Sequence, residues 1–360
     1  MEFLANLRRP ETGCYSPIIY QPNQTAQLEK MVLENQPILH DELEGMVKEL
    51  LKIRNPQKKL SESDLADMFV EWSKSNDLSR ISNYVYYPWT NKLVRMLRED
   101  EFTELRTSRN KFKITNEEQK NLANKKVGVI GLSVGQSVAL TMAIERSFGT
   151  LRIADFDILE LSNLNRIRSG VASVGLKKTT MVAREIAEID PYLKLEIFDE
   201  GITPENLDEF LTGNGPLDLL IEECDSFQIK VLARLKAREK GIAVLMDTSD
   251  RGMLDVERFD EDSTRPLFHG KLSIDSLEAF QQLNGDEIKS LLFSVVDFPL
   301  TSERLKLSYG EIGKTITTWP QLSSAVTLGG GATAHLARKI LLGQKVPSGR
   351  FYCDIDQIVN

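Results

Sequence analysis

Residues 127–166 place the strongest constraint on the fold of this chain. They begin with an apolar run that predicts a strand (VGVIG) and continue through a turn rich in glycine and serine at 131–137. A helix and a second strand, which ends at Asp155, follow the turn. A turn of small residues between a strand and a helix leaves backbone N–H groups and the positive end of the helix dipole facing outward, which suits a phosphate group. The stretch therefore predicts a nucleotide-binding α/β unit.

Asp155 lies about 20 residues beyond Gly135, at the C-terminal end of the second predicted strand. A carboxylate at that place can accept hydrogen bonds from ribose hydroxyl groups. The loop behind it, DFDILELSNLNR, adds a carboxylate, two amides and a cation: Asp157, Asn163, Asn165 and Arg166. A hydride-transferring enzyme has no need of a second group of phosphate-binding residues there, whereas an enzyme that handles ATP does.

Strands and helices alternate through the rest of the central region. Helices are predicted at 179–190, from 203 and at 226–240, and strands at 193–199, 218–224 and 242–249. This alternation indicates parallel βαβ units, in which ligands gather at the carboxyl ends of the strands. Further on, the pattern predicts an antiparallel strand at 253–260, two helices up to residue 296, a long helix at 319–342 and a final strand at 350–356.

The N-terminal region has a different pattern, with apolar residues at three- and four-residue steps. Two helices are expected within residues 27–51, interrupted near Pro37, and further helices from Ser61 and at 93–105. We therefore predict an α/β fold in which residues 106–360 form a Rossmann-like, mostly parallel sheet with an antiparallel extension. Residues 1–105 are expected to form a small helical domain that recognises a substrate or partner.

Composition excludes several classes of partner and site. A formal charge of −8 and short basic runs argue against nucleic acid, since phosphate contacts need clustered Lys and Arg. Three separated cysteines without a CxxC pair, and three histidines, predict neither a disulfide framework nor a zinc site. No apolar run approaches the roughly 18 residues of a membrane-spanning helix, and the start MEFLANLRRPE lacks the apolar centre of a signal peptide. We expect a cytoplasmic protein that binds no membrane.

The predicted strand ends bring polar residues to one edge of the sheet. In chain order these are Asp155, Asp157, Asn163, Asn165, Arg166, Lys178 and Asp225. A carboxylate for ribose, two cations and a further carboxylate suit ATP with Mg²⁺, because this metal takes carboxylate and phosphate oxygens. Arg166 offers a bidentate fork and Lys178 a point charge, and both would stabilise negative charge that moves onto a leaving pyrophosphate.

The order of these motifs resembles the ThiF/MoeB/HesA superfamily, which includes the adenylyltransferase domain of ubiquitin-activating enzymes. The matching motifs are the glycine turn, DFD, LSNLNR, VG before a lysine, IxxIDP, TPEN and a strand ending in CD. The element DxDxxxxSNLNR is highly specific, and the resemblance covers residues 106–260 strongly and 315–360 more weakly. It is strongest to a bacterial subgroup in which such a domain follows a helical region and can precede a nitroreductase-like domain.

The resemblance implies a role for each matching residue. The nucleotide-binding set that it implies is Gly131, Ser133, Gly135, Asp155, Asp157, Asn163, Arg166 and Lys178, with Asp225 as the Mg²⁺ ligand. Asp155 matches the ribose ligand, whereas Asn163, Arg166 and Lys178 match phosphate ligands. Arg109 resembles the family's arginine finger, which reaches the ATP of a partner subunit, so a homodimer is implied.

The implied reaction is attack by a carboxylate, typically a peptide or protein C-terminus, on the α-phosphate of ATP. It yields an acyl-adenylate and pyrophosphate, with Arg109, Arg166, Lys178 and Asp225 as the catalytic residues. Residues 247–251 (DTSDR) lie at the next strand end, where the acyl substrate would approach. There, Arg251 is expected either to bind a substrate carboxylate or to form a salt bridge with Asp250 or Glu257.

The chain also departs from the family pattern. The usual GxGGxG turn is replaced by GLSVGQS, which leaves fewer glycines around the phosphates. Ser133 and Ser137 are expected either to supply hydroxyl donors instead or simply to be small. The paired CxxC zinc motifs are absent, and residues 253–319 contain no cysteine that could form a thioester. Cys224 is interpreted as a small packed residue at a strand end. The adenylate is therefore expected to pass to another nucleophile and not to be stored on this chain.

Two other functions stay open at this stage. The glycine turn also fits an NAD(P)-binding Rossmann oxidoreductase, against which the SNLNR loop, Lys178 and Asp225 argue. The altered turn also fits a non-catalytic ThiF-like scaffold that has lost turnover. Three glycines at 329–331 lie inside a predicted helix, where each costs about 1 kcal/mol relative to alanine. They indicate either close packing on the sheet or contact with a ligand.

Overall fold

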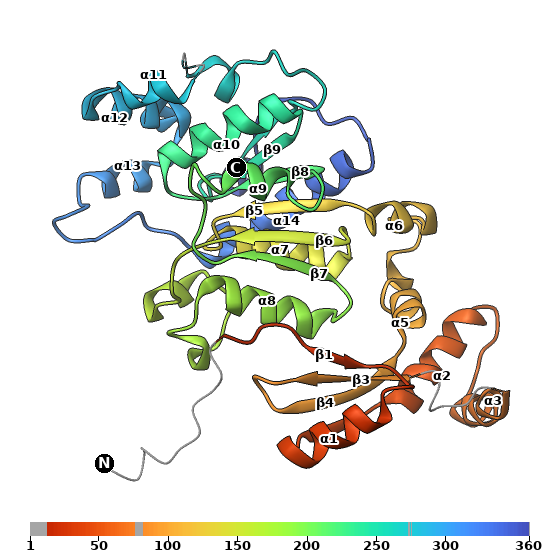
Figure 1. The fold of residues 1–360 in the computed structure, drawn as a ribbon. Coiled ribbons are helices and arrows are strands. Elements are labelled where there is room, and N and C mark those ends of the chain that lie inside the picture. Colours follow the sequence, from red (N-terminus) through yellow and green to blue (C-terminus); the bar gives the residue numbers. More distant parts are fainter. Residues whose placement is uncertain (1–12, 76–81, 273, 275, 360) are drawn as a thin grey trace, which may run out of the picture. The chain divides into compact units, whose positions relative to one another are not determined.

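The computed structural model describes residues 13–75, 82–272, 274 and 276–359 (Figure 1). The chain divides into two compact units. The first comprises residues 1–116 and 183–192, and the second comprises residues 117–182 and 193–360.

The first unit contains a four-stranded sheet in the order β1-β3-β4-β2. Pairing is antiparallel between β1 and β3 and between β3 and β4, and parallel between β2 and β4. The strands are β1 Ile18–Tyr20, β2 Ile38–Asp41, β3 Ser82–Tyr87 and β4 Lys92–Leu97. The helices are α1 Thr25–Asn35, α2 Leu43–Arg54, α3 Glu62–Ser75, α5 Glu99–Arg106 and the short η2 Ser108–Asn110.

These strands correct the prediction of a purely helical N-terminal region. The helices on either side of Pro37 are confirmed as α1 and α2, and Ser61 caps α3, since its Oγ accepts a hydrogen bond from the backbone N of Asp64 at 3.2 Å. The helix expected at 93–105 is instead β4 followed by α5. Aromatic and β-branched residues favour strands, and Asn91, at a φ of +50°, closes the turn between β3 and β4.

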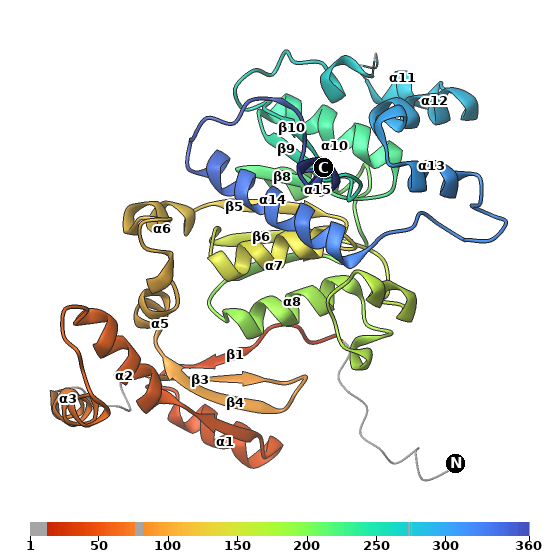
Figure 2. The same ribbon diagram turned by 180° about the vertical axis from the view of Figure 1, so that it is seen from behind.

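The second unit contains a seven-stranded sheet in the order β11-β10-β9-β8-β5-β6-β7. Figure 2 labels β10, β9, β8, β5 and β6 of this sheet. The five strands from β9 to β7 in this order are parallel, and β10 and β11 extend the sheet in antiparallel pairing, as the sequence predicts. The strands are β5 Lys126–Ile130, β6 Thr150–Ala154, β7 Lys194–Phe198, β8 Leu219–Glu222, β9 Ala243–Asp247, β10 Met253–Glu257 and β11 Gly349–Tyr352.

Helices cover both faces of this sheet, with α7 and α14 on one face and α9 and α10 on the other (Figures 1 and 2). The helices that precede β9 are α6 Asn116–Leu122, α7 Gly135–Glu145, η3 Leu161–Asn165, η4 Val171–Ser173, α8 Lys178–Ile189, α9 Leu207–Thr212 and α10 Phe227–Lys240. Those that follow are η5 Leu267–Gly270, α11 Leu277–Gln281, α12 Gly285–Val295, η6 Phe298–Leu300, α13 Glu303–Tyr309, α14 Ser323–Leu341 and α15 Ile355–Ile358. Of the helices in the described ranges, none is long and apolar enough to cross a bilayer.

Three predicted boundaries differ from the structure. The helix expected from residue 203 begins at Leu207, because Thr203 and Asn206 bond each other's backbone N–H groups and form a turn first. The final strand ends at Tyr352, because Asp354 caps α15 through the backbone N of Asp356. The long helix α14 begins at Ser323, four residues after the predicted start, and α13 was not predicted.

The three glycines inside α14 mark close packing, the first of the two interpretations. A Cβ atom built on Gly329 would lie 1.7 Å from Oδ2 of Asp247, and one on Gly330 would lie 2.2 Å from Oγ of Ser137. Glycine at these two positions therefore lets α14 approach β9 and α7. Gly331 has open space at its Cβ position.

Candidate functional site

A cleft of about 460 Å³ opens at the carboxyl ends of β5, β6 and β8 in the second unit. It brings together eight of the residues predicted from the sequence: Gly131, Ser133, Asp155, Asp157, Asn163, Arg166, Lys178 and Asp225. The expected convergence of separate chain segments at one sheet edge is therefore present in the structure.

The turn between β5 and α7 shapes one wall of the cleft. Gly131 has a φ of +85°, and a Cβ atom built on it would lie 2.7 Å from the backbone N of Cys224. Only glycine permits this approach of the turn to the end of β8. Gly135 does not line the cleft, because it is the first residue of α7 and packs on Val129. Gly135, which was predicted to bind the nucleotide, can therefore affect binding only indirectly, through the packing of the turn.

Asp155 follows β6 and fixes the backbone around the cleft. Its Oδ2 accepts a hydrogen bond from the backbone N of Leu132 at 2.7 Å, and its Oδ1 accepts one from the backbone N of Asp157 at 2.8 Å. Burial raises the pKa of Asp155, while the nearby Lys178 acts in the opposite direction. Each carboxylate oxygen has a second lone pair. Asp155 can therefore hold the turn and still accept a bond from a ribose hydroxyl.

Two cations enter the cleft from different segments. Lys178, the first residue of α8, places its Nζ 2.7 Å from Oδ2 of Asp157. Arg166, which follows η3, donates from Nε to Oγ of Ser133 at 2.9 Å. Burial lowers the pKa of Arg166, and Asp225 opposes that effect. Ser133, which stands where the family has glycine, thus acts as an acceptor that positions a cation.

The two asparagines of the SNLNR loop have different surroundings. Asn163 lines the cleft, and its Oδ1 accepts a hydrogen bond from the backbone N of Glu160 at 3.1 Å. Asn165 is not a lining residue. Its Oδ1 accepts a bond from Arg166 NH1 at 3.0 Å, and its Nδ2 donates to the carbonyl oxygen of Gln321 at 2.8 Å. Asn165 therefore orients Arg166.

Asp225 follows β8 as an exposed residue at the rim of the cleft. Its carboxylate forms no hydrogen bond or ion pair within the described part of the chain, so its oxygens are available to a cation. No cluster of three or more His, Cys, Asp or Glu side chains suited to a metal occurs among the described residues. A single carboxylate at a phosphate site suits Mg²⁺, which binds proteins through one or two carboxylates and completes its shell with phosphate oxygens and water.

Two other predicted residues, Arg109 and Arg251, lie outside the cleft. Arg109 is part of η2 in the first unit, where it lines a hollow with Leu97, Phe102 and Leu105. Its role as an arginine finger stays a prediction. Arg251 forms an ion pair, as one interpretation expected, but its partner is Asp354, whose Oδ2 lies 2.6 Å from its Nε, and not Asp250 or Glu257.

Cys224 lies at the boundary of the cleft but is not suited to thioester chemistry. Its Sγ donates to the carbonyl oxygen of Ser226 at 3.6 Å. Burial and the neighbouring Glu222 raise the pKa of the thiol well above its ordinary value. The nucleophile in thioester formation is the thiolate. These contacts favour the interpretation of Cys224 as a packed residue.

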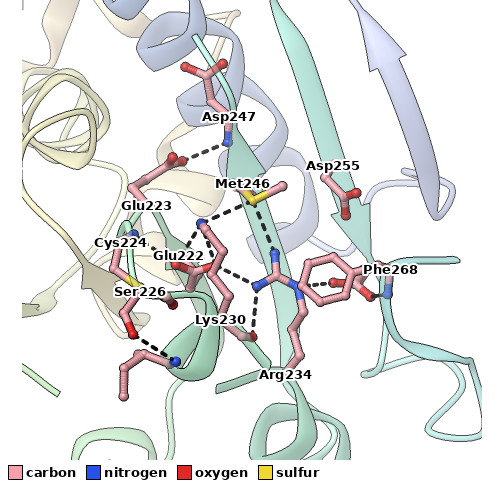
Figure 3. A network of polar contacts seen from close by, with 12 residues as sticks. Glu222, Glu223, Cys224, Ser226, Lys230, Arg234, Met246, Asp247, Asp255 and Phe268 are labelled. Atoms are coloured by element: carbon pink, nitrogen blue, oxygen red, sulfur yellow. Dashed lines mark hydrogen bonds and ion pairs between the residues drawn. The ribbon is translucent and has the colours of Figure 1, made fainter. Parts of the chain in front are cut away.

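Glu223 is a buried acid that none of the sequence motifs includes as a site residue. It is 7% exposed and lines the cleft. Its Oε1 accepts a hydrogen bond from the backbone N of Asp247 at 2.9 Å, and Figure 3 shows the two side chains at the ends of neighbouring strands. Burial and the charge of Asp247 hold the pKa of Glu223 well above its ordinary value. The only sequence signal was an acid pair at the end of an apolar strand.

Comparisons with known proteins identify the family and relatives of this chain. A model of the ThiF family matches residues 107–353. The protein MT1398 of Mycobacterium tuberculosis (strain CDC 1551 / Oshkosh) is 44% identical over 279 residues, which are 77% of this chain and 38% of that protein. Ubiquitin-like modifier-activating enzyme 5 of Drosophila persimilis is 30% identical over 128 residues, which are 33% of each chain. The chain thus spans only 38% and 33% of the length of these two relatives.

Solved structures resemble the chain in fold. The structure of PaaA has a TM-score of 0.51 and 21% identity, over 72% of this chain and 81% of that one. The structure of Escherichia coli MccB has a TM-score of 0.50 and 14% identity, over 86% of this chain and 82% of that one. At these identities the likeness concerns the fold alone.

Proposed function

The chain belongs to the ThiF family, and we propose that it is an ATP-dependent adenylyltransferase, a nucleotidyltransferase of the ubiquitin-activating type. The observation that carries the proposal is the cleft of about 460 Å³, where Arg166, Lys178, Asp155 and Asp225 meet beside the Gly131 turn. Two cations and two carboxylates in this arrangement match the phosphates, ribose and metal of ATP with Mg²⁺. They offer more phosphate-binding charge than a nicotinamide cofactor requires.

Each residue of the cleft has a place in this proposal. Asp155 accepts hydrogen bonds from the ribose hydroxyls, and the turn at Gly131 and Ser133 faces the phosphates. Lys178 and Arg166 bind the β- and γ-phosphates. Asp225 would hold Mg²⁺, which neutralises phosphate charge when it is bound.

The reaction forms one bond to phosphorus and breaks another. A carboxylate oxygen of the substrate attacks the α-phosphorus of ATP, and the bond from that phosphorus to the oxygen bridging to the β-phosphate breaks. The electron pair leaves with pyrophosphate, and an acyl-adenylate results. Arg166 and Lys178 stabilise the negative charge that develops on the leaving group, an effect that typically exceeds other contributions in such reactions.

The acyl-adenylate is passed to a nucleophile outside this chain. The raised pKa of the half-buried Cys224 supports this, because a thiol that stays protonated does not attack an acyl-adenylate. The substrate that we propose is the C-terminal carboxylate of a peptide or small protein. The name of the Drosophila relative, which refers to activation of a ubiquitin-like modifier, supports this class of substrate.

We extend the proposal to assembly and location. Two chains form a homodimer in which Arg109 reaches the ATP bound by the partner, and the first unit recognises the substrate or a partner protein. The reaction takes place in the cytoplasm, for which the three free cysteines are typical. That this domain can precede a nitroreductase-like domain stays a prediction.

The proposal is tested by ATP–pyrophosphate exchange. The full chain is incubated with ATP, Mg²⁺, labelled pyrophosphate and a panel of peptides with free C-termini, with Arg166→Ala as the inactive control. Isothermal titration with ATP and with NADH is run beside it. We expect ATP but not NADH to bind, and exchange to depend on a free carboxylate. Tight binding of NADH, or exchange at background across the panel despite ATP binding, would contradict the proposal, and the latter would favour the scaffold.

A further inference from the structure

A second cavity, of about 330 Å³, adjoins the nucleotide cleft at the carboxyl ends of β8 and β9. The two cavities share Glu223, Cys224 and Asp225 as lining residues. Since Asp225 is the residue to which we assign Mg²⁺, a molecule in the second cavity would lie next to the phosphates of a bound nucleotide. The second cavity is therefore the place from which an acyl substrate can reach the α-phosphate.

The floor of this cavity is formed by two buried acids that lack a cationic partner. Glu223 is 7% exposed and Asp247 is 4% exposed. Asp247 accepts a hydrogen bond at Oδ1 from the backbone N of Ser249 at 2.8 Å, and Glu223 accepts one at Oε1 from the backbone N of Asp247. Across residues 13–75, 82–272, 274 and 276–359, neither carboxylate forms an ion pair, and Oε2 of Glu223 accepts no hydrogen bond.

Lys230, the lysine that lines the cavity, forms its ion pair with a different acid, Glu222. Lys230 places its Nζ 3.1 Å from each carboxylate oxygen of Glu222, and Arg234 also pairs with Glu222 (Figure 3). Glu222 is thus balanced by two cations of α10. Glu223 and Asp247 are consequently left without a cationic partner among the described residues.

The wall opposite the acids is apolar and aromatic. It is formed by residues of α12, η6, α13 and the segment before α14: Leu292, Phe293, Phe298, Leu305 and Trp319. Trp319 is held in place by stacking on Tyr309, with ring centroids 5.6 Å apart. An apolar wall that faces buried acids suits a side chain with an aliphatic stem and a cationic end, because the stem packs while the charge pairs. Aromatic rings next to a cation add a further attraction.

We propose that this cavity selects acyl substrates whose C-terminal residue carries a cationic side chain, which pairs with Glu223 and Asp247 while its carboxylate meets the α-phosphate. The inference rests on the proposed adenylation and makes its substrate class more specific. A substrate without such a cation would leave the two buried acids unpaired beside its own carboxylate. The cation gives both buried acids the partner that they lack.

The test compares three acetylated tripeptides that differ only in their last residue: Gly-Gly-Lys, Gly-Gly-norleucine and Gly-Gly-Glu. Each is titrated calorimetrically into the full chain held with Mg²⁺ and α,β-methylene-ATP, whose binding is measured first. The lysine peptide should bind at least about tenfold more tightly than the norleucine peptide, and the glutamate peptide most weakly. In the Asp247→Asn variant the lysine preference should fall below about threefold, whereas Asp199→Asn, an exposed acid of another segment, should keep it.

The outcomes separate the inference from the proposed function. Equal affinities for the lysine and norleucine peptides, or binding of none of the three by protein that binds the nucleotide analogue, would overturn the inference alone. Failure of the analogue to bind would overturn the proposed function and the inference with it. If Asp247→Asn does not fold, as judged by circular dichroism, Glu223→Gln provides the same comparison, and an unchanged lysine preference in that variant counts against the proposal.

Discussion

The ammonium group of Lys178 lies 2.7 Å from Oδ2 of Asp157, on the wall of the nucleotide cleft. The lysine is 4% exposed, although it is the first residue of α8. Its neighbour Lys177 is directed elsewhere and pairs with Asp199 and Glu200 at 3.1 and 3.0 Å. Two adjacent lysines therefore have different surroundings, and only one of them can meet a phosphate in the cleft.

This difference provides a matched pair of variants. Lys178→Met should raise the Kd for ATP by roughly 10- to 100-fold, as expected for loss of a hydrogen bond between charged groups. Lys177→Met should change it by less than about twofold, because exposed ion pairs contribute little. Isothermal titration with ATP and Mg²⁺ measures both. Similar losses in the two variants would mean that long-range charge, and not contact with Lys178, governs binding.

Arg166 is expected to act mainly on the chemical step. Its Nε donates to Ser133, which leaves other guanidinium N–H groups for the leaving pyrophosphate. Arg166→Ala should lower kcat of ATP–pyrophosphate exchange by roughly 100- to 1,000-fold while the Kd for ATP changes less. The exposed Arg168 is the control, and Arg168→Ala should leave both constants nearly unchanged. A rise in Kd with an unchanged kcat would instead assign Arg166 to ground-state binding.

The proposed contact of Asp155 with ribose can be isolated with a modified nucleotide. In the native protein, 2′,3′-dideoxy-ATP should bind more weakly than ATP by roughly one order of magnitude, because hydrogen bonds to a charged acceptor are lost. In Asp155→Asn both nucleotides should bind weakly and nearly equally, since the two changes remove the same interaction. Calorimetry on the four combinations measures the coupling. Additive losses would show that Asp155 serves only to hold the backbone at Leu132 and Asp157.

The sequence predicted the parts of the site that depend on local order. The Gly131 turn, Asp155 and the SNLNR loop follow one another closely, and the alternation of strands and helices places Lys178 and Asp225 at the same sheet edge. Glu223 escaped prediction because its environment depends on the lateral pairing of β8 with β9, which brings it to the backbone of Asp247. No local sequence pattern indicates which strands lie side by side in the sheet.

Two other differences have similar causes. β3 and β4 were not predicted as a pair because Leu93, Met96 and Leu97 lie at three- and four-residue steps that also fit a helix. The turn at Asn91 distinguishes the hairpin. The partner of Arg251, Asp354, is 103 residues away in sequence. The sequence favours a nearby acid such as Asp250 as the partner of Arg251. Asp250 instead accepts hydrogen bonds from the backbone N and Oγ of Ser302.

The glycines of α14 allow a direct test of close packing. In Gly330→Ala the new Cβ would meet backbone and side-chain atoms of Ser137, so the protein should lose roughly 1–3 kcal/mol of unfolding free energy. In Gly331→Ala the Cβ enters open space, and the gain in helix propensity should stabilise by up to about 1 kcal/mol. Urea denaturation compares the two variants. Because Ser137 belongs to α7, which follows the phosphate turn, ATP affinity should also fall in Gly330→Ala alone.

The last prediction concerns the pH dependence that Asp247 imposes on stability. Burial raises the pKa of this carboxyl from 3.8 to about 6. A carboxyl with a higher pKa in the folded state holds its proton more tightly there than in the unfolded chain. The protonated carboxyl of Asp247 therefore adds its full contribution to the free energy of unfolding below pH 3.8. That contribution is lost as the pH rises towards 6. Because a tenfold difference in proton affinity corresponds to about 1.4 kcal/mol, the native protein should lose about 2 kcal/mol relative to Asp247→Asn between about pH 4 and pH 7.

Urea unfolding followed by tryptophan fluorescence at several pH values across this range measures the difference. Asparagine keeps an oxygen that can accept the bond from Ser249 N, so the variant removes the titration and retains that contact. The urea midpoints of the two proteins should diverge in favour of the variant as the pH rises, with most of the change below about pH 6. Parallel midpoints would place the pKa of Asp247 near its ordinary value. The carboxyl would then not be desolvated in the folded protein, which contradicts the burial on which the proposed cation-binding cavity depends.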